Sequence, residues 1–160
     1  MKEAVIVAAC RTAIGKAPRG VLKDTRPEEM GCAVLGELLK RAGDLDPLLI
    51  DDVIIGCTFP EATQGLNLGR VLVMSMGWPD RIPGMTVNRF CSSGLQSIAM
   101  AANRVVAEGV PVMAAGGVES ISLVTMQGSN TNNIVEPELY GRMPALWMAM
   151  IETAEIVAER

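Results

Sequence analysis

The sequence predicts an α/β fold built on a largely parallel sheet, and three observations lead to this prediction. Short apolar runs alternate with segments of helical periodicity along the chain. The 160 residues are 49% hydrophobic and 20% charged, so the chain can bury one sizeable core without disulfides. The spacing between the apolar runs leaves room for a crossover helix, which is typical of parallel strands joined by right-handed connections.

Four apolar runs predict strands, and the first two read as strands buried on both faces because they are almost continuously apolar. The run ending at Cys10 precedes a loop with Gly and Pro that extends to Arg26, and Gly116 and Gly117 follow the last run. In order, the predicted strands are residues 3–10, 52–57, 85–88 and 110–115.

Three segments predict helices between these strands. The first begins at Pro27, with acidic residues in its first turn, basic residues in its last turn and Gly43 after it. The second covers residues 66–76. The third begins at Ser92 and carries no charge before Arg104, so we expect it to be enclosed on several sides.

The character of the chain changes after Ser122. Residues 127–133 are polar, and residues 143–150 are rich in methionine around Trp147. A second region is therefore expected from about residue 120. Residues 151–160 look helical but end without a stop signal, which suggests that the chain has been cut, with a frayed terminus as the alternative.

Charge and motif content exclude several functional classes. The 14 Lys and Arg residues against 18 Asp and Glu give a net charge of −4, which disfavours binding to nucleic acid or to an anionic membrane. The first apolar run is too short for a signal peptide, so a cytoplasmic protein is expected. The four cysteines form no CxxC pair, and neither a dinucleotide-binding nor a P-loop motif is present, so no metal site and no nucleotide site is expected.

The chain contains no histidine. This removes the most common general base and the most common metal ligand. Any chemistry at this chain is therefore free of histidine or incomplete.

Cys91 is the candidate catalytic residue. It follows the third predicted strand and directly precedes the third predicted helix, where free N–H groups favour the thiolate form and can hold an oxyanion. The alternative is a packed, inert cysteine, because free cysteine is often buried. For Cys10, Cys57 and Cys32, packing is the expected role.

Four blocks of the sequence resemble the thiolase family. Residues 5–16 (VIVAACRTAIGK) are similar to the family's opening strand and turn, with Ala13 where proline is usual. Residues 87–96 (VNRFCSSGLQ) resemble the block around the acyl-accepting cysteine, and residues 115–122 (AGGVESIS) resemble a second glycine-rich block. Residues 150–160 (MIETAEIVAER) resemble a helix of the family.

The resemblance implies acyl transfer between a 3-ketoacyl-CoA and CoA, as in fatty-acid β-oxidation, with Cys91 as nucleophile and its N–H in the oxyanion hole. It implies that Met150 lines the reaction cavity and that CoA is a substrate, with no cofactor. It also implies a layered α/β/α/β/α fold, in which residues 1–119 form an amino-terminal half-domain and residues 120–160 begin the loop domain that receives CoA. Acyl-CoA and CoA are then the partners, and a homodimer or homotetramer is expected.

Departures from the family pattern qualify this interpretation. Thiolases are longer than this chain, and their second half supplies the catalytic histidines and a second cysteine, so the chain alone is predicted to be inactive. Ile151 stands where glycine is usual, which favours short acyl chains. The degradative type is favoured by residues 91–96 and 120–128. A biosynthetic acetoacetyl-CoA thiolase, a related condensing enzyme and a lipid-binding protein remain alternatives.

Overall fold

The computed structural model describes residues 3–126 and 130–160, which belong to two compact units, Met1–Ser129 and Asn130–Arg160. The first unit contains a parallel sheet with the strand order β2-β1-β3. Its strands are β1 (Asp52–Gly56), β2 (Gly84–Val87) and β3 (Met113–Gly117). In the central register, Ile54 of β1 lies opposite Met85 of β2 and Ala115 of β3.

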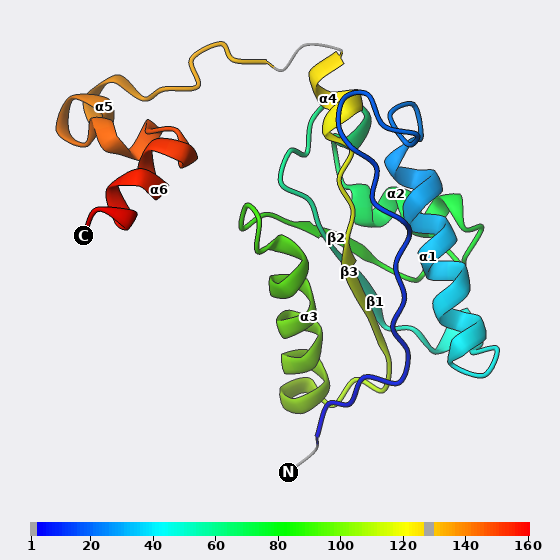
Figure 1. Ribbon diagram of the computed structural model, residues 1–160. Helices are drawn as coiled ribbons and strands as arrows, with labels where there is room; N and C mark the ends of the chain where they lie inside the picture. The colour runs from blue at the N-terminus through cyan, green and yellow to red at the C-terminus, as the bar shows by residue number, and fades with distance from the viewer. Residues whose placement is uncertain (1–2, 127–129) are drawn as a thin grey trace. The chain divides into compact units, whose positions relative to one another are not determined.

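Helices cover both faces of this sheet. The helices α1 (Pro27–Arg41) and α2 (Leu68–Ser75) lie on one face, and α3 (Ser93–Asn103) lies on the other (Figure 1). The predicted α/β class with parallel strands is confirmed. The three predicted helices are also confirmed, with bounds shifted by one or two residues at their ends.

The main core fills the space between β1 and the pair α1 and α2. Every residue of β1 is buried, which fits the apolar run over residues 53–56, and the buried Asp52 at its start pairs with Arg104. Helix α1 has the predicted end signals, with Pro27 at its start and Lys40 and Arg41 in its last turn. The core cluster consists of Leu35, Ile50, Val53, Ile55, Leu72, Val73, Trp78 and Ile82.

The predicted strand over residues 3–10 is wrong. The described part of this segment, residues 3–10, is not paired into the sheet, and Val5, Ile6 and Val7 are more than 70% exposed. A strand needs a ladder partner, and this segment does not pair with either outer edge of the sheet, which β2 and β3 form. The segment instead contacts α1, where Cys10 Sγ donates to the Val34 carbonyl at 3.4 Å.

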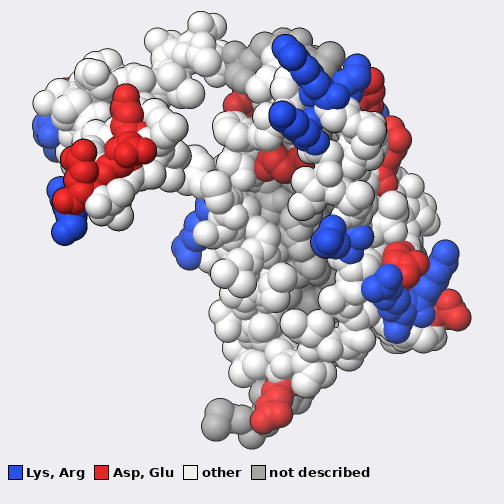
Figure 2. Space-filling view, viewed as in Figure 1, with Lys and Arg blue, Asp and Glu red and all other residues white. Residues whose placement is uncertain are grey.

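Helix α3 also differs from the expectation of enclosure on several sides. Its small residues Ser93, Ser97 and Ala101 are buried against the sheet. On the other face, Leu95 is 72% exposed and Ile98 is 42% exposed. The lack of charge therefore reflects an exposed apolar face in this chain. Figure 2 shows that charged side chains of both signs gather near α1 and that few lie over α3.

Ser97 joins α3 to the sheet. Its hydroxyl is fully buried and lies 2.7 Å from both the Gly94 carbonyl and the Gly116 carbonyl. We expect Ser97→Ala to lower the free energy of unfolding by about 1–3 kcal/mol, because it leaves a buried acceptor without its donor. Ser75→Ala at the exposed end of α2 is the control, with an expected change within about 0.5 kcal/mol. Equal urea-unfolding midpoints for the two variants would contradict this role for Ser97.

Short elements complete the two units. The first unit also contains the turns η1 (Pro47–Leu49) and η2 (Ala62–Gln64), the π-helical turn η3 (Arg104–Glu108) and α4 (Ile121–Met126). The second contains α5 (Pro137–Arg142), η4 (Pro144–Trp147) and α6 (Met150–Ala158). The helical reading of the last residues is thus confirmed. None of the helices in residues 3–126 and 130–160 combines the length and the hydrophobicity that a membrane span requires.

Candidate functional site

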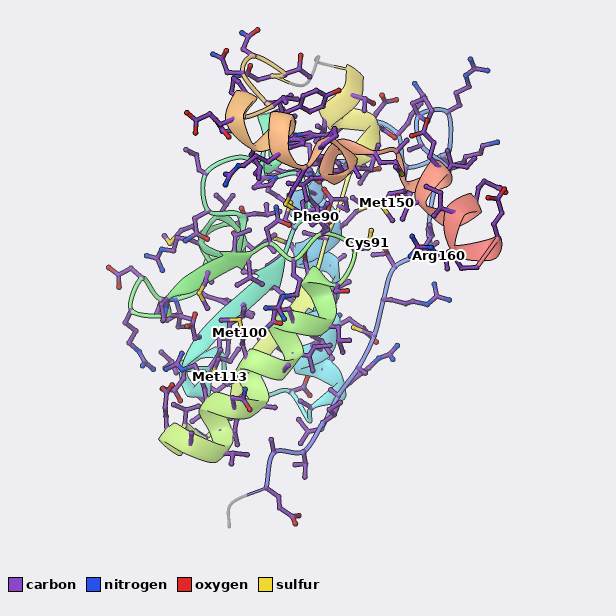
Figure 3. All side chains as sticks on the ribbon, turned by 90° about the vertical axis from the view of Figure 1, so that its left-hand side faces the viewer. Phe90, Cys91, Met100, Met113, Met150 and Arg160 are labelled. Carbon is purple, nitrogen blue, oxygen red and sulfur yellow. The ribbon has the colours of Figure 1, made fainter. Side chains whose placement is uncertain are left out.

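Cys91 lies on the turn that leads from β2 into α3, two residues before the first helical residue (Figure 3). The preceding residue, Phe90, has a φ of 48°, a left-handed conformation that is uncommon for an aromatic residue. Asn88 stabilises the entry to this turn, because its Oδ1 accepts from the Phe90 N–H at 2.8 Å. The turn exposes the Cys91 side chain to solvent.

Ser93 ties this turn to the first turn of α3. Its hydroxyl donates a hydrogen bond to the Phe90 carbonyl at 2.5 Å and accepts one from the Arg89 N–H at 2.9 Å. The Ser93 N–H also donates to the Phe90 carbonyl at 3.0 Å. The left-handed turn is thus held by side-chain and backbone groups of the helix that follows it, as a strained backbone conformation requires.

Glycines let the start of α3 approach the sheet closely. A Cβ atom on Gly56, at the end of β1, would lie 2.3 Å from the Ser93 carbonyl carbon. A Cβ atom on Gly117 would lie 3.2 Å from the Gly94 Cα. A side chain is excluded at Gly56, because the backbone of α3 occupies the space of its Cβ atom, and at Gly117 the contact would be tight. The carboxyl ends of β1 and β3 therefore fix the helix terminus beside which Cys91 lies.

A polar cluster surrounds the Glu119 carboxylate, just beyond β3. Its Oε2 accepts from the Thr58 N–H at 2.6 Å, and its Oε1 accepts from the Phe59 N–H at 3.3 Å. The Gln64 amide, which is fully buried, donates to Oε1 at 2.5 Å and to the Phe59 carbonyl at 2.8 Å. Thr58 also reaches the Cys91 turn, because its hydroxyl donates to the Phe90 carbonyl at 3.0 Å.

The four thiols of the chain differ in exposure. Cys91 is the exposed one, Cys57 is buried, and Cys10 and Cys32 are partly buried. Burial, together with the Glu119 carboxylate 3.7 Å away, raises the pKa of the Cys57 thiol to about 12. Burial and the Glu28 charge raise the pKa of the Cys32 thiol. The expected packing of Cys57 is confirmed, and Cys32 packs against the core cluster.

These differences predict an order of alkylation. At pH 8, we expect iodoacetamide to modify Cys91 at least about 100-fold faster than Cys57, because a thiol with a pKa near 12 is only about 10⁻⁴ thiolate there. The Cys57 rate should rise as the pH approaches 12. Time-resolved peptide mapping of the folded chain measures both rates, with Cys91→Ser as the control that removes the fast phase. Faster modification of Cys57 would contradict this order.

Met150 is in the second unit, where it begins α6 and is 80% exposed. Ile151 follows it and is 73% exposed. The Met-rich stretch does not form a core within this unit, since Met143 is also exposed, although Trp147 packs edge-on against Tyr140 with ring centroids 5.8 Å apart. Cys91 and Met150 thus belong to different compact units.

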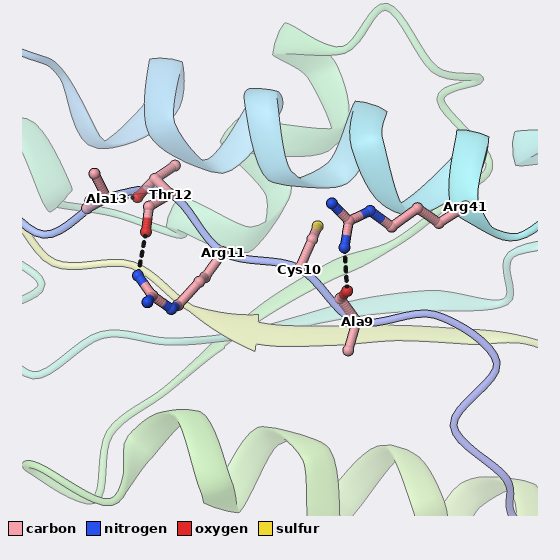
Figure 4. A pocket seen from close by; sticks show the side chains of 6 residues that line it. All are labelled: Ala9, Cys10, Arg11, Thr12, Ala13 and Arg41. Atoms are coloured by element: carbon pink, nitrogen blue, oxygen red, sulfur yellow. Dashed lines mark hydrogen bonds between the residues drawn. The ribbon is translucent and has the colours of Figure 1, made fainter.

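A separate open groove runs along the amino-terminal segment (Figure 4). Arg41 crosses it from α1 and donates to the Ala9 carbonyl at 2.9 Å, and Arg11 donates to the Thr12 carbonyl at 3.1 Å. Both guanidinium groups are used in holding the segment. Within the described ranges, no group of three or more His, Cys, Asp or Glu residues could hold a metal ion.

Sequence reasoning identified Cys91 and missed the polar cluster behind it. Thr58 and Gln64 lie in the loop after β1, and only their position after the carboxyl end of a parallel strand could have drawn attention to them. Glu119 lies in the block of residues 115–122 that resembles the family, and the sequence alone assigns its side chain no contact. Their contacts join segments more than 50 residues apart, which a local pattern does not reveal.

Comparisons with known proteins agree with these observations. The family model described as the thiolase N-terminal domain matches residues 4–154. A 3-ketoacyl-CoA thiolase of Bacillus subtilis is 47% identical over 161 residues, which is 100% of this chain and 40% of that protein. An acetyl-CoA acetyltransferase of Syntrophomonas wolfei is 38% identical over 120 residues, which cover 75% of this chain and 30% of that protein.

A solved structure also matches. The crystal structure of the Bacillus anthracis acetyl-CoA acetyltransferase matches with a TM-score of 0.70 and 39% identity, covering 76% of this chain and 30% of that one. The chain therefore spans less than half the length of these relatives.

Proposed function

This chain belongs to the thiolase family, and we propose that it supplies the acyl-accepting cysteine of an acyltransferase acting between 3-ketoacyl-CoA and CoA. The observation that carries the proposal is the exposed Cys91 thiol beside the amino terminus of α3. The other three cysteines are buried or partly buried. CoA enters as a substrate, and no separate cofactor takes part.

The proposed reaction has two acyl transfers. The Cys91 thiolate attacks the 3-keto carbon, and the Cys91 N–H helps to hold the developing oxyanion. The bond between carbons 2 and 3 then breaks, acetyl-CoA leaves after gaining a proton at carbon 2, and the acyl group remains on sulfur. In the second transfer, the CoA thiolate attacks this thioester and releases the Cys91 thiolate. Sulfur suits both steps because it is a good nucleophile and a good leaving group.

The proton transfers of this scheme need groups that the chain lacks. With no histidine in the sequence, the chain lacks the side chain that most often serves as a general base near neutral pH. We therefore expect the purified 160-residue chain to show no thiolysis of acetoacetyl-CoA. A chimera in which the chain replaces the matching segment of the Bacillus subtilis thiolase should be active. Turnover by the chain alone, or a folded but inactive chimera, would contradict this part of the proposal.

The degradative type is the favoured subgroup. It is supported by the sequence at residues 91–96 and by the sequence pattern over residues 120–128. Residues 127–128 of this pattern lie outside the described residues. The biosynthetic acetoacetyl-CoA type is the second candidate, favoured by the similarity to two acetyl-CoA acetyltransferases. Rates of the chimera on 3-ketoacyl-CoA substrates of increasing length distinguish the two, because only a degradative enzyme should accept chains beyond four carbons.

Met150 and Ile151 are proposed to line the reaction cavity and to limit acyl length. Residues 120–160 are proposed to begin the region that receives CoA, and a homodimer or homotetramer in the cytoplasm is the proposed assembly. Ile151→Gly in the chimera should raise activity on longer acyl chains relative to acetoacetyl-CoA, since it removes a branched side chain. An unchanged ratio of activity on longer acyl chains to activity on acetoacetyl-CoA would show that Ile151 does not limit acyl length.

A further inference from the structure

We infer that Glu119, Gln64 and Thr58 are positioning residues for the Cys91 thiol. They form a hydrogen-bonded path from the end of β3 to the turn that carries the cysteine. The inference rests on the nucleophilic role proposed for Cys91. It assigns these residues no contact with substrate.

The path begins at the Glu119 carboxylate, which gathers four donors. They are the backbone N–H groups of Thr58 and Phe59, the Gln64 amide and the Cys57 thiol. Gln64 is itself fixed, because its carbonyl oxygen accepts from the Ser120 N–H and its amide donates to the Phe59 carbonyl. The loop after β1 is thus fastened to the end of β3 by one partly buried carboxylate.

The path continues through Thr58 to the cysteine turn. The Thr58 hydroxyl donates to the Phe90 carbonyl at 3.0 Å, and the Thr58 carbonyl accepts from Asn88 Nδ2 at 2.9 Å. Asn88 in turn accepts from the Phe90 N–H. Both polar groups of the Phe90 backbone are therefore held, directly or through Asn88, by the segment that Glu119 fixes.

This restraint matters because Phe90 adopts a left-handed conformation, with a φ of 48°. Such a conformation is costly for a residue with a Cβ atom and persists only when its surroundings hold it. The same turn sets where Cys91 lies relative to the amino terminus of α3. A turn that relaxes would change the position of Cys91 relative to the first turn of α3.

Two substitutions test the path with little change in shape. Thr58→Val removes the hydroxyl and nearly keeps the volume, while Thr58→Ser keeps the hydroxyl. Glu119→Gln replaces one acceptor oxygen by an NH₂ group, which must then face either the Thr58 N–H or the donors around Oε1. Glu155→Gln on α6 is the matched control for loss of one negative charge.

The readout is the pH dependence of Cys91 alkylation in the 160-residue chain, followed by peptide mapping below the unfolding transition. We expect Thr58→Val and Glu119→Gln to slow alkylation near pH 7 by about 3- to 10-fold and to shift the profile to higher pH. Thr58→Ser and Glu155→Gln should stay within twofold of wild type. A variant that only lowers the free energy of unfolding would leave the pH dependence of Cys91 alkylation in the folded protein unchanged.

The outcomes separate this inference from the proposed function. If Cys91 is reactive in the wild type and Thr58→Val alkylates at the same rate or faster, the positioning role is overturned while the nucleophile remains. If wild-type Cys91 reacts no faster than Cys10, the proposed function fails and the inference fails with it. If Glu119→Gln does not fold, the positioning role is decided by comparing the Cys91 alkylation rates of Thr58→Val and Thr58→Ser.

Discussion

Cys91→Ala is expected to reduce thiolysis by the chimera about 10⁴-fold or more. Without the sulfur, no thioester can form, and what remains is the residual effect of binding and of the oxyanion hole. The assay is the consumption of acetoacetyl-CoA in the presence of CoA, with the chimera that carries the wild-type chain as the reference.

Cys32→Ala is the matched control for this loss. Cys32 lies in α1 and packs against the core cluster, so its replacement removes a small, partly buried side chain and leaves the Cys91 turn in place. We expect its turnover to stay within a few-fold of the reference. Retention of more than a tenth of the activity by Cys91→Ala would show that another group accepts the acyl chain.

Gly56→Ala is expected to lower the free energy of unfolding by about 3 kcal/mol, near the upper end of the range for overpacking. Its Cβ atom would lie 2.3 Å from the Ser93 carbonyl carbon and 2.5 Å from the Gly94 nitrogen. These are backbone atoms of the first turn of α3, which cannot swing away as a side chain can. The helix terminus must shift, so the alkylation rate of Cys91 should change as well.

Gly36→Ala is the opposite case and serves as the control. Gly36 lies inside α1, and the nearest atom to an added Cβ would be the Met76 Cε at 3.8 Å, which is an ordinary contact. Alanine in a helix loses less backbone freedom on folding, so this variant should gain about 0.5–1 kcal/mol. Chemical denaturation of both variants tests the pair. A Gly56→Ala variant as stable as wild type would show that α3 does not depend on this close approach.

Much of the first unit could be predicted from periodicity and end signals. Pro27, the acidic first turn and the basic last turn placed α1, and the apolar run at residues 52–57 placed the central strand. The prediction of a strand at residues 3–10 is wrong because an apolar run shows that a strand is possible and does not show that it pairs with another strand.

The site was predictable only in its most local part. The order of strand, cysteine and helix pointed to Cys91, because a helix terminus acts on the residues next to it. The left-handed Phe90 gave no signal, since phenylalanine is not a residue that usually marks such a turn. The support from Thr58, Gln64 and Glu119 depends on contacts between distant segments, which only the fold brings together.

The central claim is that the acyl group is carried by the sulfur of Cys91. The most direct measurement is to quench the chimera in acid during turnover of acetoacetyl-CoA and to map the peptides by mass spectrometry. The account predicts an acetyl group on the peptide that contains Cys91, which hydroxylamine removes and Cys91→Ala lacks. An acetyl group on a different cysteine, or turnover with no acylated peptide at any time, would contradict the account.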